Sequence, residues 1–176
     1  IQNLNDIDAD VVFIKNIDNV VPDRLKGDTV TYKQLLAGVL VKLQAEAFAM
    51  LRKLDEGATE AEMQEMLLWL QEKCFCYAPD GETLTGDKLH KYLKTKLNRP
   101  MRACGMVRNV GEPGGGPFLA YNSDGTVSPQ ILESSQIDMA DAEKKAMFEQ
   151  GTHFNPVDLV CALKDYKGHR FHLPQY

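Results

Sequence analysis

The stretch Asp10-Val-Val-Phe-Ile-Lys-Asn-Ile-Asp-Asn19 decides the fold class, because it joins a strand pattern to a polar loop. The run Val11–Lys15 is nearly continuous in apolar, mostly β-branched side chains. Such a run is typical of a buried strand in a sheet that is covered on both faces. The polar residues that follow predict a loop at the carboxyl end of this strand, and Pro22 marks the connection that leaves it.

Residues 30–98 change to a helical period and predict a helical segment between strands. Gly57 is expected to end the first helix, and Thr59-Glu-Ala-Glu62 is a capping box that begins the second. Thr85 is expected to cap a third helix. The Met and Leu stripes of these helices indicate core or helix-packing surface rather than a cofactor site.

Strand patterns return after residue 98. We expect strands at Met101–Val107, Phe118–Tyr121, Gln130–Ser134 and Val157–Lys164, a hairpin turn at Asn122-Ser-Asp-Gly125 and a short helix at Met139–Gln150. This order predicts an α/β fold with a mixed sheet and helices packed on it. The chain then divides into a first strand and loop (1–29), a helical segment (30–98) and a strand-rich part (99–176).

The chain has 176 residues and a formal net charge of −5, which argues for one domain and against a nucleic-acid partner. No apolar stretch is expected to approach the ~20 residues of a membrane span, so no membrane partner is predicted. The four cysteines lack the spacing of metal ligands and predict free thiols in the cytoplasm. Because the chain starts at Ile1 rather than Met, we expect an incomplete domain that a further N-terminal segment precedes.

A glycine-rich loop is the strongest local signal for binding: Gly105-Met-Val-Arg-Asn-Val-Gly-Glu-Pro-Gly-Gly-Gly-Pro-Phe118. Three glycines between two prolines exclude a helix and favour a stiff loop whose main chain a ligand can approach. A side chain at Gly115 is then expected to clash with ligand more than with protein. Arg108, with Glu112 close by in the sequence, places a cation where it could bind phosphate oxygens. A structural hairpin connection is the alternative interpretation.

Three further groups are candidates for ligand chemistry. Asp18 follows the first strand, and a carboxylate there can hold a Mg²⁺ ion that neutralises phosphate oxygens. The amides of Asn16 and Asn19 add donors and acceptors for a polar ligand. Glu133 can accept hydrogen bonds from sugar hydroxyls. A common Asp/Asn turn and an exposed strand residue are the alternatives for these positions.

Three segments resemble the signatures of a family of uncharacterised proteins, domain-of-unknown-function family 4301. They are Ile14–Leu25, Gly111–Phe118 and His153–Val160. The segments are long and specific, and they span nearly the whole chain. This resemblance implies kinship without implying an activity.

The same landmarks, in the same order, are more distantly similar to sugar-nucleotide uridylyltransferases of the UDP-N-acetylglucosamine pyrophosphorylase type. That resemblance implies a three-layer fold of the nucleotide-diphospho-sugar transferase type. It also implies a reaction that joins a sugar 1-phosphate to UTP with Mg²⁺ and releases pyrophosphate.

The resemblance carries over to two loops. The Val-Asp-Asn metal motif of those enzymes is similar to Ile17-Asp18-Asn19, which implies that Asp18 is the metal ligand. Their Glu-Pro-x-Gly sugar loop is similar to Glu112-Pro113-Gly114-Gly115. Glu112, Gly114 and Gly115 are therefore implied to contact the sugar.

It also carries over to two later segments. The Val-Val-Glu-Tyr-Ser strand of those enzymes is similar to Gln130–Ser135, with Glu133 as the sugar-binding acid. Their Phe-Asn-x-x-Asn segment is similar to Phe154-Asn155-Pro156-Val157-Asp158. Asn155 and Asp158 are thus implied to bind substrate, although an Asp replaces the second Asn of that segment.

Two elements of those enzymes have no counterpart here. Their N-terminal Gly-rich loop, which holds the triphosphate and the base, does not precede Asp18, and Arg108 is the nearest cation to their catalytic lysine. We therefore expect the acceptor-side part of a Mg²⁺-dependent nucleotidyltransferase that binds a sugar phosphate or nucleotide sugar and is inactive alone. The alternatives are a non-catalytic module for such ligands and a scaffold that packs residues 30–73 on a partner.

Overall fold

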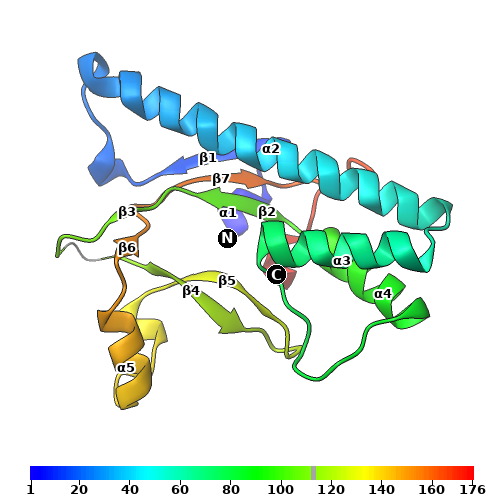
Figure 1. Ribbon diagram of the computed structural model, residues 1–176. Helices are drawn as coiled ribbons and strands as arrows, with labels where there is room; N and C mark the ends of the chain where they lie inside the picture. The colour runs from blue at the N-terminus through cyan, green and yellow to red at the C-terminus, as the bar shows by residue number, and fades with distance from the viewer. Residues whose placement is uncertain (112–113) are drawn as a thin grey trace.

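The computed structural model describes residues 1–111 and 114–176. The helices are α1 (Gln2–Asn5), α2 (Lys26–Glu56), α3 (Glu60–Cys74), α4 (Gly86–Leu97) and α5 (Ala142–Glu149). The strands are β1 (Val11–Lys15), β2 (Met101–Cys104), β3 (Val107–Arg108), β4 (Gly116–Tyr121), β5 (Val127–Leu132), β6 (His153–Phe154) and β7 (Asp158–Ala162). In Figure 1 the long helix α2 runs along one side of the molecule, and α5 lies at the opposite side below the β4–β5 hairpin.

The central sheet has three strands in the order β1-β7-β2. Alternate residues of β7 face opposite sides, as the pleat of a strand requires. Val160 and Ala162 pack with Leu40 of α2 in one buried cluster. Cys161 packs with Phe171 in another cluster, on the side of the C-terminal segment. The strand β7 is thus covered on both faces.

The strand β1 differs from the sequence expectation. It lies at the edge of its sheet and pairs with β7 alone, and Phe13 is 51% exposed. The prediction of a fully buried strand is wrong here, because an edge strand has one neighbour and α2 does not cover its whole outer face.

The strands form three separate sheets, β1-β7-β2, β3-β6 and β4-β5. Every strand pair in the described residues is antiparallel. The α/β character is therefore confirmed, whereas the single mixed sheet is wrong. The argument that placed Asp18 at the ligand-binding edge of a parallel sheet does not apply, since that edge exists only where strands share one direction.

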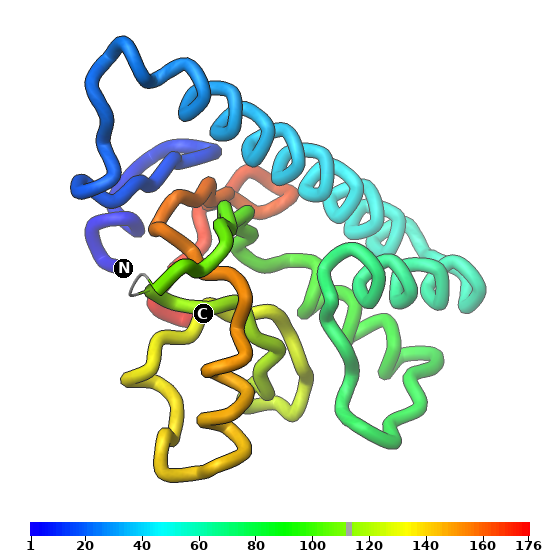
Figure 2. Tube along the Cα trace, turned by 60° about the vertical axis from the view of Figure 1, so that its left-hand side comes forward, coloured from blue at the N-terminus to red at the C-terminus, as the bar shows by residue number. Residues whose placement is uncertain are grey.

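The largest core lies in the helical segment. Buried leucines and methionines of α2, α3 and α4 pack into one cluster, which includes Leu51, Met66 and Leu89. Figure 2, turned from the first view, shows α3 and α4 packed beside the C-terminal end of α2. The predicted helical stripes are confirmed as core in this half of the segment.

The ends of these helices are mostly fixed as the sequence predicts. Gly57 ends α2 in a left-handed conformation with φ 104°, and Thr59 forms the capping box that begins α3. Thr85 is the N-cap residue of α4, but its side chain makes no capping hydrogen bond. The carboxylate of Glu60 accepts from the backbone N–H of Gly86 instead, at 2.9 Å.

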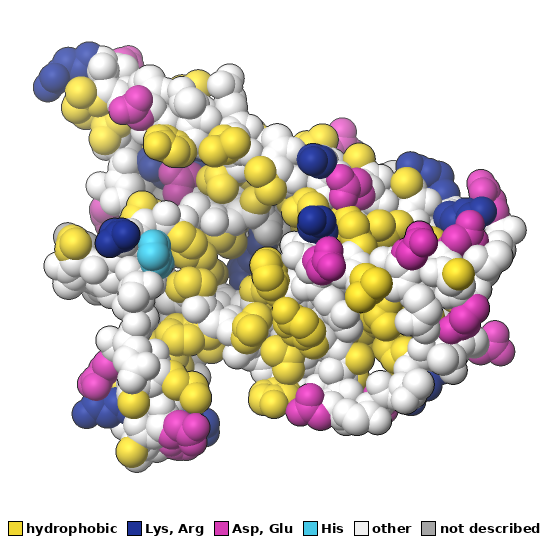
Figure 3. Space-filling view, viewed as in Figure 1, with side chains coloured by type: hydrophobic (Ala, Val, Ile, Leu, Met, Phe, Trp, Pro, Cys, Tyr) yellow, Lys and Arg dark blue, Asp and Glu magenta, His cyan; other side chains and the backbone are white. Residues whose placement is uncertain are grey.

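The first half of α2 carries exposed apolar side chains, although the helical pattern predicts them as core or helix-packing surface. Tyr32, Leu35 and Val39 are 66%, 60% and 46% exposed. Figure 3 shows hydrophobic side chains on the surface along this end of the helix. By length and composition, the helical stretch Asp23–Glu56 is also long and apolar enough to cross a membrane, so the expectation that no such stretch exists is wrong.

The β4–β5 hairpin turns at Asn122–Gly125, as predicted. The backbone N–H of Asn122 donates to the carbonyl of Thr126 at 2.7 Å, and Gly125 supplies the positive φ of 78° that the turn requires. The rings of Phe118 and Phe148 stack at 6.0 Å and hold α5 against the hairpin. The hairpin thus presents its two strands between α5 and the helical segment.

Candidate functional site

Residues 155–158, the short turn after β6 together with the first residue of β7, form the centre of a junction between loops that are distant in the sequence. The backbone N–H of Asn16 donates to the carbonyl of Val157 at 2.9 Å. The side-chain amide of Asn19 donates to the carbonyl of Pro156 at 2.8 Å. The loop after β1, the strand β3 and the strand β6 consequently lie at the same end of the molecule (Figure 1).

Asn155 holds the other side of this junction together. Its backbone N–H donates to the carbonyl of Gly115 at 2.9 Å, and its buried side-chain amide donates to the carbonyl of Gly105 at 2.7 Å. Its side-chain oxygen accepts from the N–H of Val157, a residue held at φ 54°. Asn155 therefore positions the glycine loop, and a hydrogen bond from its amide to a sugar would have to displace one of these contacts.

The glycines of the loop lie tightly against protein side chains. A Cβ added at any of the three would lie within 2.8 Å of a neighbouring side chain. At Gly114 that neighbour is Phe154, at Gly115 it is Ile131, and at Gly116 it is Phe118. The expectation that a side chain at Gly115 would clash with ligand more than with protein is wrong, because Ile131 already fills that space. These glycines allow the loop to pack closely on its own neighbours.

Glu133 lies beside this loop. Its Cγ is 3.4 Å from the position that a Cβ on Gly115 would take. Its backbone N–H donates to the side chain of Gln136 at 3.0 Å, and the residue is exposed. Within residues 1–111 and 114–176 its carboxylate has no cationic partner. Glu133 is also the N-cap residue of a short 3₁₀ helix, η3 (Ser134–Gln136), in a capping-box arrangement with Gln136, so a ligand next to Gly115 would share this carboxylate with the cap.

Asp18 lies in an exposed turn of 3₁₀ helix, η1 (Ile17–Asn19). The side-chain oxygen of Asn16 accepts from the N–H of Asp18 at 3.3 Å and fixes this turn. The described part of the chain contains no cluster of three or more acidic, His or Cys side chains that could hold a metal. A Mg²⁺ ion at Asp18 would have this one protein carboxylate and would need its remaining oxygens from water and substrate phosphates.

Arg108 extends from β3, which pairs with β6 so that Arg108 lies opposite His153. It is exposed and makes no salt bridge with the described residues. The strand β6 lies between Arg108 and the glycine loop, because β6 pairs with β3 and the residue that follows β6, Asn155, pairs with Gly115. Glu112 lies outside the described residues.

Two lysines that the sequence analysis missed meet at Asp158. The Nζ atoms of Lys15 and Lys33 lie 2.9 Å and 2.5 Å from its carboxylate oxygens. Burial raises the pKa of Asp158, but hydrogen bonds from Lys33 and Lys15 outweigh burial and hold the pKa below its usual value. Two cations on one carboxylate leave one excess positive charge beside the loop that carries Asp18.

Only one of these lysines carries a signal in the sequence. Lys15 stands directly before Asn16, where a cation near the predicted metal loop could have been suspected. Lys33 carries no such signal, because only the packing of α2 on the central sheet brings it to Asp158. A direct sugar contact by Asp158 would compete with both ion pairs.

These features define an α/β protein in which small antiparallel sheets and a packed helical segment hold a polar junction at one end. The chain belongs to the family described as "Domain of unknown function (DUF4301)", whose sequence profile matches residues 1–176. This match confirms the kinship inferred from three segments of the sequence. No curated protein and no solved structure matches the chain, so the more distant similarity to uridylyltransferases stays a prediction.

Proposed function

We propose that this chain supplies the acceptor side of a Mg²⁺-dependent nucleotidyltransferase and binds a sugar 1-phosphate or nucleotide sugar at the junction. The observation that supports this proposal is the close approach of Glu133 to Gly115, on a loop that Asn155 anchors. The pairing of β4 with β5 places Glu133 next to Gly115, Asn155 joins them from a separate segment, and the hairpin alone would not require an exposed carboxylate there.

Each group has a distinct part in the proposed site. The carboxylate of Glu133 accepts hydrogen bonds from sugar hydroxyls, and the backbone of Gly114 and Gly115 forms the adjoining wall. The excess charge of Lys15 and Lys33 attracts the phosphate, and Arg108, on the other side of β6, adds positive charge at the same end of the molecule (Figure 1). Asn16, Asn19 and Asn155 act as positioning residues, because their side chains bond to this protein's own backbone.

Asp18 would be the protein ligand of the metal. A bound Mg²⁺ ion would neutralise charge on the phosphate oxygens. The four free thiols are consistent with the reducing cytoplasm proposed for the protein.

Calorimetric titration with glucose 1-phosphate and N-acetylglucosamine 1-phosphate tests the proposal. Glu133→Gln should weaken binding about tenfold, because an amide accepts hydrogen bonds from hydroxyls less strongly than a carboxylate. Glu72→Gln is the matched control, since Glu72 is exposed on α3. Equal affinity of both variants, or no binding of either sugar phosphate to the unmodified chain, would remove the sugar role of Glu133.

The metal role is tested separately. If Asp18 holds Mg²⁺, addition of Mg²⁺ should strengthen sugar phosphate binding to the unmodified chain but not to Asp18→Asn. An equal gain in both proteins would show that Asp18 is only a turn residue.

The main alternative is a non-catalytic module that binds the same ligands. Two observations favour this alternative. The side chains of Asn155 and Asp158 bond to other groups of the protein. The proposed metal site has a single carboxylate among the described residues. Binding of sugar phosphates that does not respond to Mg²⁺ would support this alternative over the enzyme.

A further inference from the structure

A groove of about 410 Å³ lies between the helical segment and the β4–β5 hairpin. Its lining comes from α2, α3, β2, both strands of the hairpin and the segment that joins α4 to β2. Hydrophobic side chains are exposed between α3 and the hairpin in Figure 3. A concave, mainly apolar site of this size is typical of small-molecule binding.

The charged residues of the groove are all cationic. Lys73, Lys96, Arg99 and Arg102 line it, and no Asp or Glu does. Lys96 pairs with Asp124 at 2.5 Å, whereas the other three form no salt bridge within the described residues. A concave surface with excess cations attracts anions, because its low-dielectric walls concentrate the positive potential.

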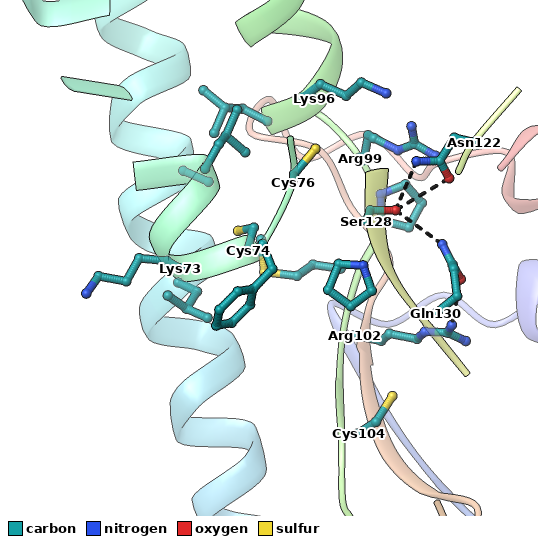
Figure 4. A pocket seen from close by; sticks show the side chains of 18 of the residues that line it. Lys73, Cys74, Cys76, Lys96, Arg99, Arg102, Cys104, Asn122, Ser128 and Gln130 are labelled. Carbon is teal, nitrogen blue, oxygen red and sulfur yellow. Dashed lines mark hydrogen bonds between the residues drawn. The ribbon is translucent and has the colours of Figure 1, made fainter. Parts of the chain in front are cut away.

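The two arginines lie on one side of the groove. Figure 4 shows Arg99 and Arg102 beside the polar side chains of Asn122, Ser128 and Gln130, with Lys73 on the opposite side. A guanidinium N–H of Arg102 donates to the side-chain oxygen of Gln130 at 3.2 Å, and the amide of Asn122 donates to the hydroxyl of Ser128 at 3.0 Å. Arginine binds phosphate through paired N–H donors, so this side suits a phosphoryl group.

An aromatic ring is held at the groove at a conformational cost. Phe75 lines the groove, is 52% exposed and follows the last residue of α3 with φ 51° and ψ 36°. This left-handed conformation is usual for glycine after a helix and is rare for a bulky residue. Strained residues of this kind concentrate at functional sites. The ring offers a face on which a planar ligand can stack.

The thiols of the groove add apolar surface rather than nucleophiles. Burial raises the pKa of Cys74 to about 11, and burial also raises the pKa of Cys104. Both thiols are therefore neutral at physiological pH, and the thiolate is the reactive form. Cys76, the third thiol of the groove, is buried, and non-covalent contacts are the chemistry proposed for this groove.

We infer that the groove binds a phosphorylated small molecule with a flat aromatic ring, the class to which mononucleotides belong. The ring stacks on Phe75, and the phosphate meets the cationic side of the groove, where Arg102 lies beside Gln130 and Arg99 beside Asn122 (Figure 4). The groove uses different side chains from Glu133 and the residue 155–158 turn, so this inference does not rest on the proposed sugar site.

Calorimetric titration with UMP and AMP, beside uridine, adenosine and inorganic phosphate, tests the inference. Both monophosphates should bind more tightly than their nucleosides and than phosphate, since each contacts the ring and the cations together. Arg102→Gln and Arg99→Gln should each weaken monophosphate binding about tenfold and leave nucleoside binding unchanged. Arg52→Gln is the control, because it removes the same charge from an exposed position of α2 outside the groove.

Phe75→Gly separates the role of the ring from folding. Glycine adopts the left-handed conformation readily, so the midpoint of thermal unfolding should fall little or rise, while binding of monophosphates and nucleosides weakens. Absence of UMP and AMP binding to the unmodified chain at about 5 mM would overturn the inference. Unchanged affinity in Phe75→Gly, or an equal response of Arg102→Gln and Arg52→Gln, would overturn it as well.

Discussion

The helical segment and the junction at residues 155–158 are held together by different kinds of interaction. In the helical segment, leucines and methionines of α2, α3 and α4 bury one another in a continuous cluster. At the junction, hydrogen bonds of Asn155, the ion pairs of Asp158 and the close packing of Gly115 join loops. Apolar packing depends on side-chain volume, whereas the junction depends on single atoms in fixed directions.

The helix α2 belongs to both regions and shows the contrast within one element. Its C-terminal half contributes Ala47 and Leu51 to the core, with no exposed surface. Its N-terminal half leaves Leu35 mostly exposed but brings Lys33 to Asp158. The helix therefore packs on the helical core at its C-terminal end and on the central sheet through Leu40, while its N-terminal turns leave apolar side chains exposed and position a charge.

The largest effect is expected in the helical core. Leu51→Ala should lower the free energy of unfolding by between about 2 and 5 kcal/mol, because it leaves a cavity where a fully buried side chain was. Leu35→Ala should change it by less than about 0.5 kcal/mol, since that side chain is exposed. Urea unfolding of both variants measures the difference, and similar losses would show that the two halves of α2 are equally packed.

The next effect tests the close packing of the glycine loop. Gly115→Val should cost about 3 kcal/mol, because its Cβ would lie 2.6 Å from Ile131 and the neighbouring strand must shift. In the double variant with Ile131→Ala, the loss should be smaller than the sum of the two single losses. Strict additivity in urea unfolding would mean that the loop does not rest on Ile131.

A smaller effect is expected where Asn155 bonds to the backbone. Asn155→Ala should cost about 2 kcal/mol, since the carbonyl of Gly105 and the N–H of Val157 lose their partner. Hydrogen exchange should quicken at Val157 while the amides of α3 and α4 keep their protection. Uniformly faster exchange across the molecule would show that the junction and the helical core unfold together.

The smallest effect is a dependence on pH. The pKa of Asp158 is held below its usual value of about 3.9, so the ion pairs stabilise the protein above that pH and are lost as pH falls through the lowered pKa. Relative to Asp158→Asn, the unmodified chain should be more stable by on the order of 1 kcal/mol at neutral pH. This advantage should shrink below about pH 4, and a constant difference in urea unfolding would exclude this role of the ion pairs.

Local sequence determined the ends of elements. Gly57 ends α2, Thr59 begins α3 and the Asn122–Gly125 turn joins β4 to β5, each as the residue types predict. These features depend on neighbours within a few residues, so the pattern alone is sufficient. Glu133 and Gly115 were likewise identified as site candidates before the structure brought them together.

Tertiary structure decided how those elements meet. The antiparallel order β1-β7-β2, the exposure of Leu35 and the ion pair between Lys33 and Asp158 all join residues far apart in the chain. The sequence leaves these partners open, because strand direction and helix burial depend on which distant surface packs against each element. The excess charge at Asp158 and the cationic groove beside Phe75 exist only because the folded chain brings those distant residues together.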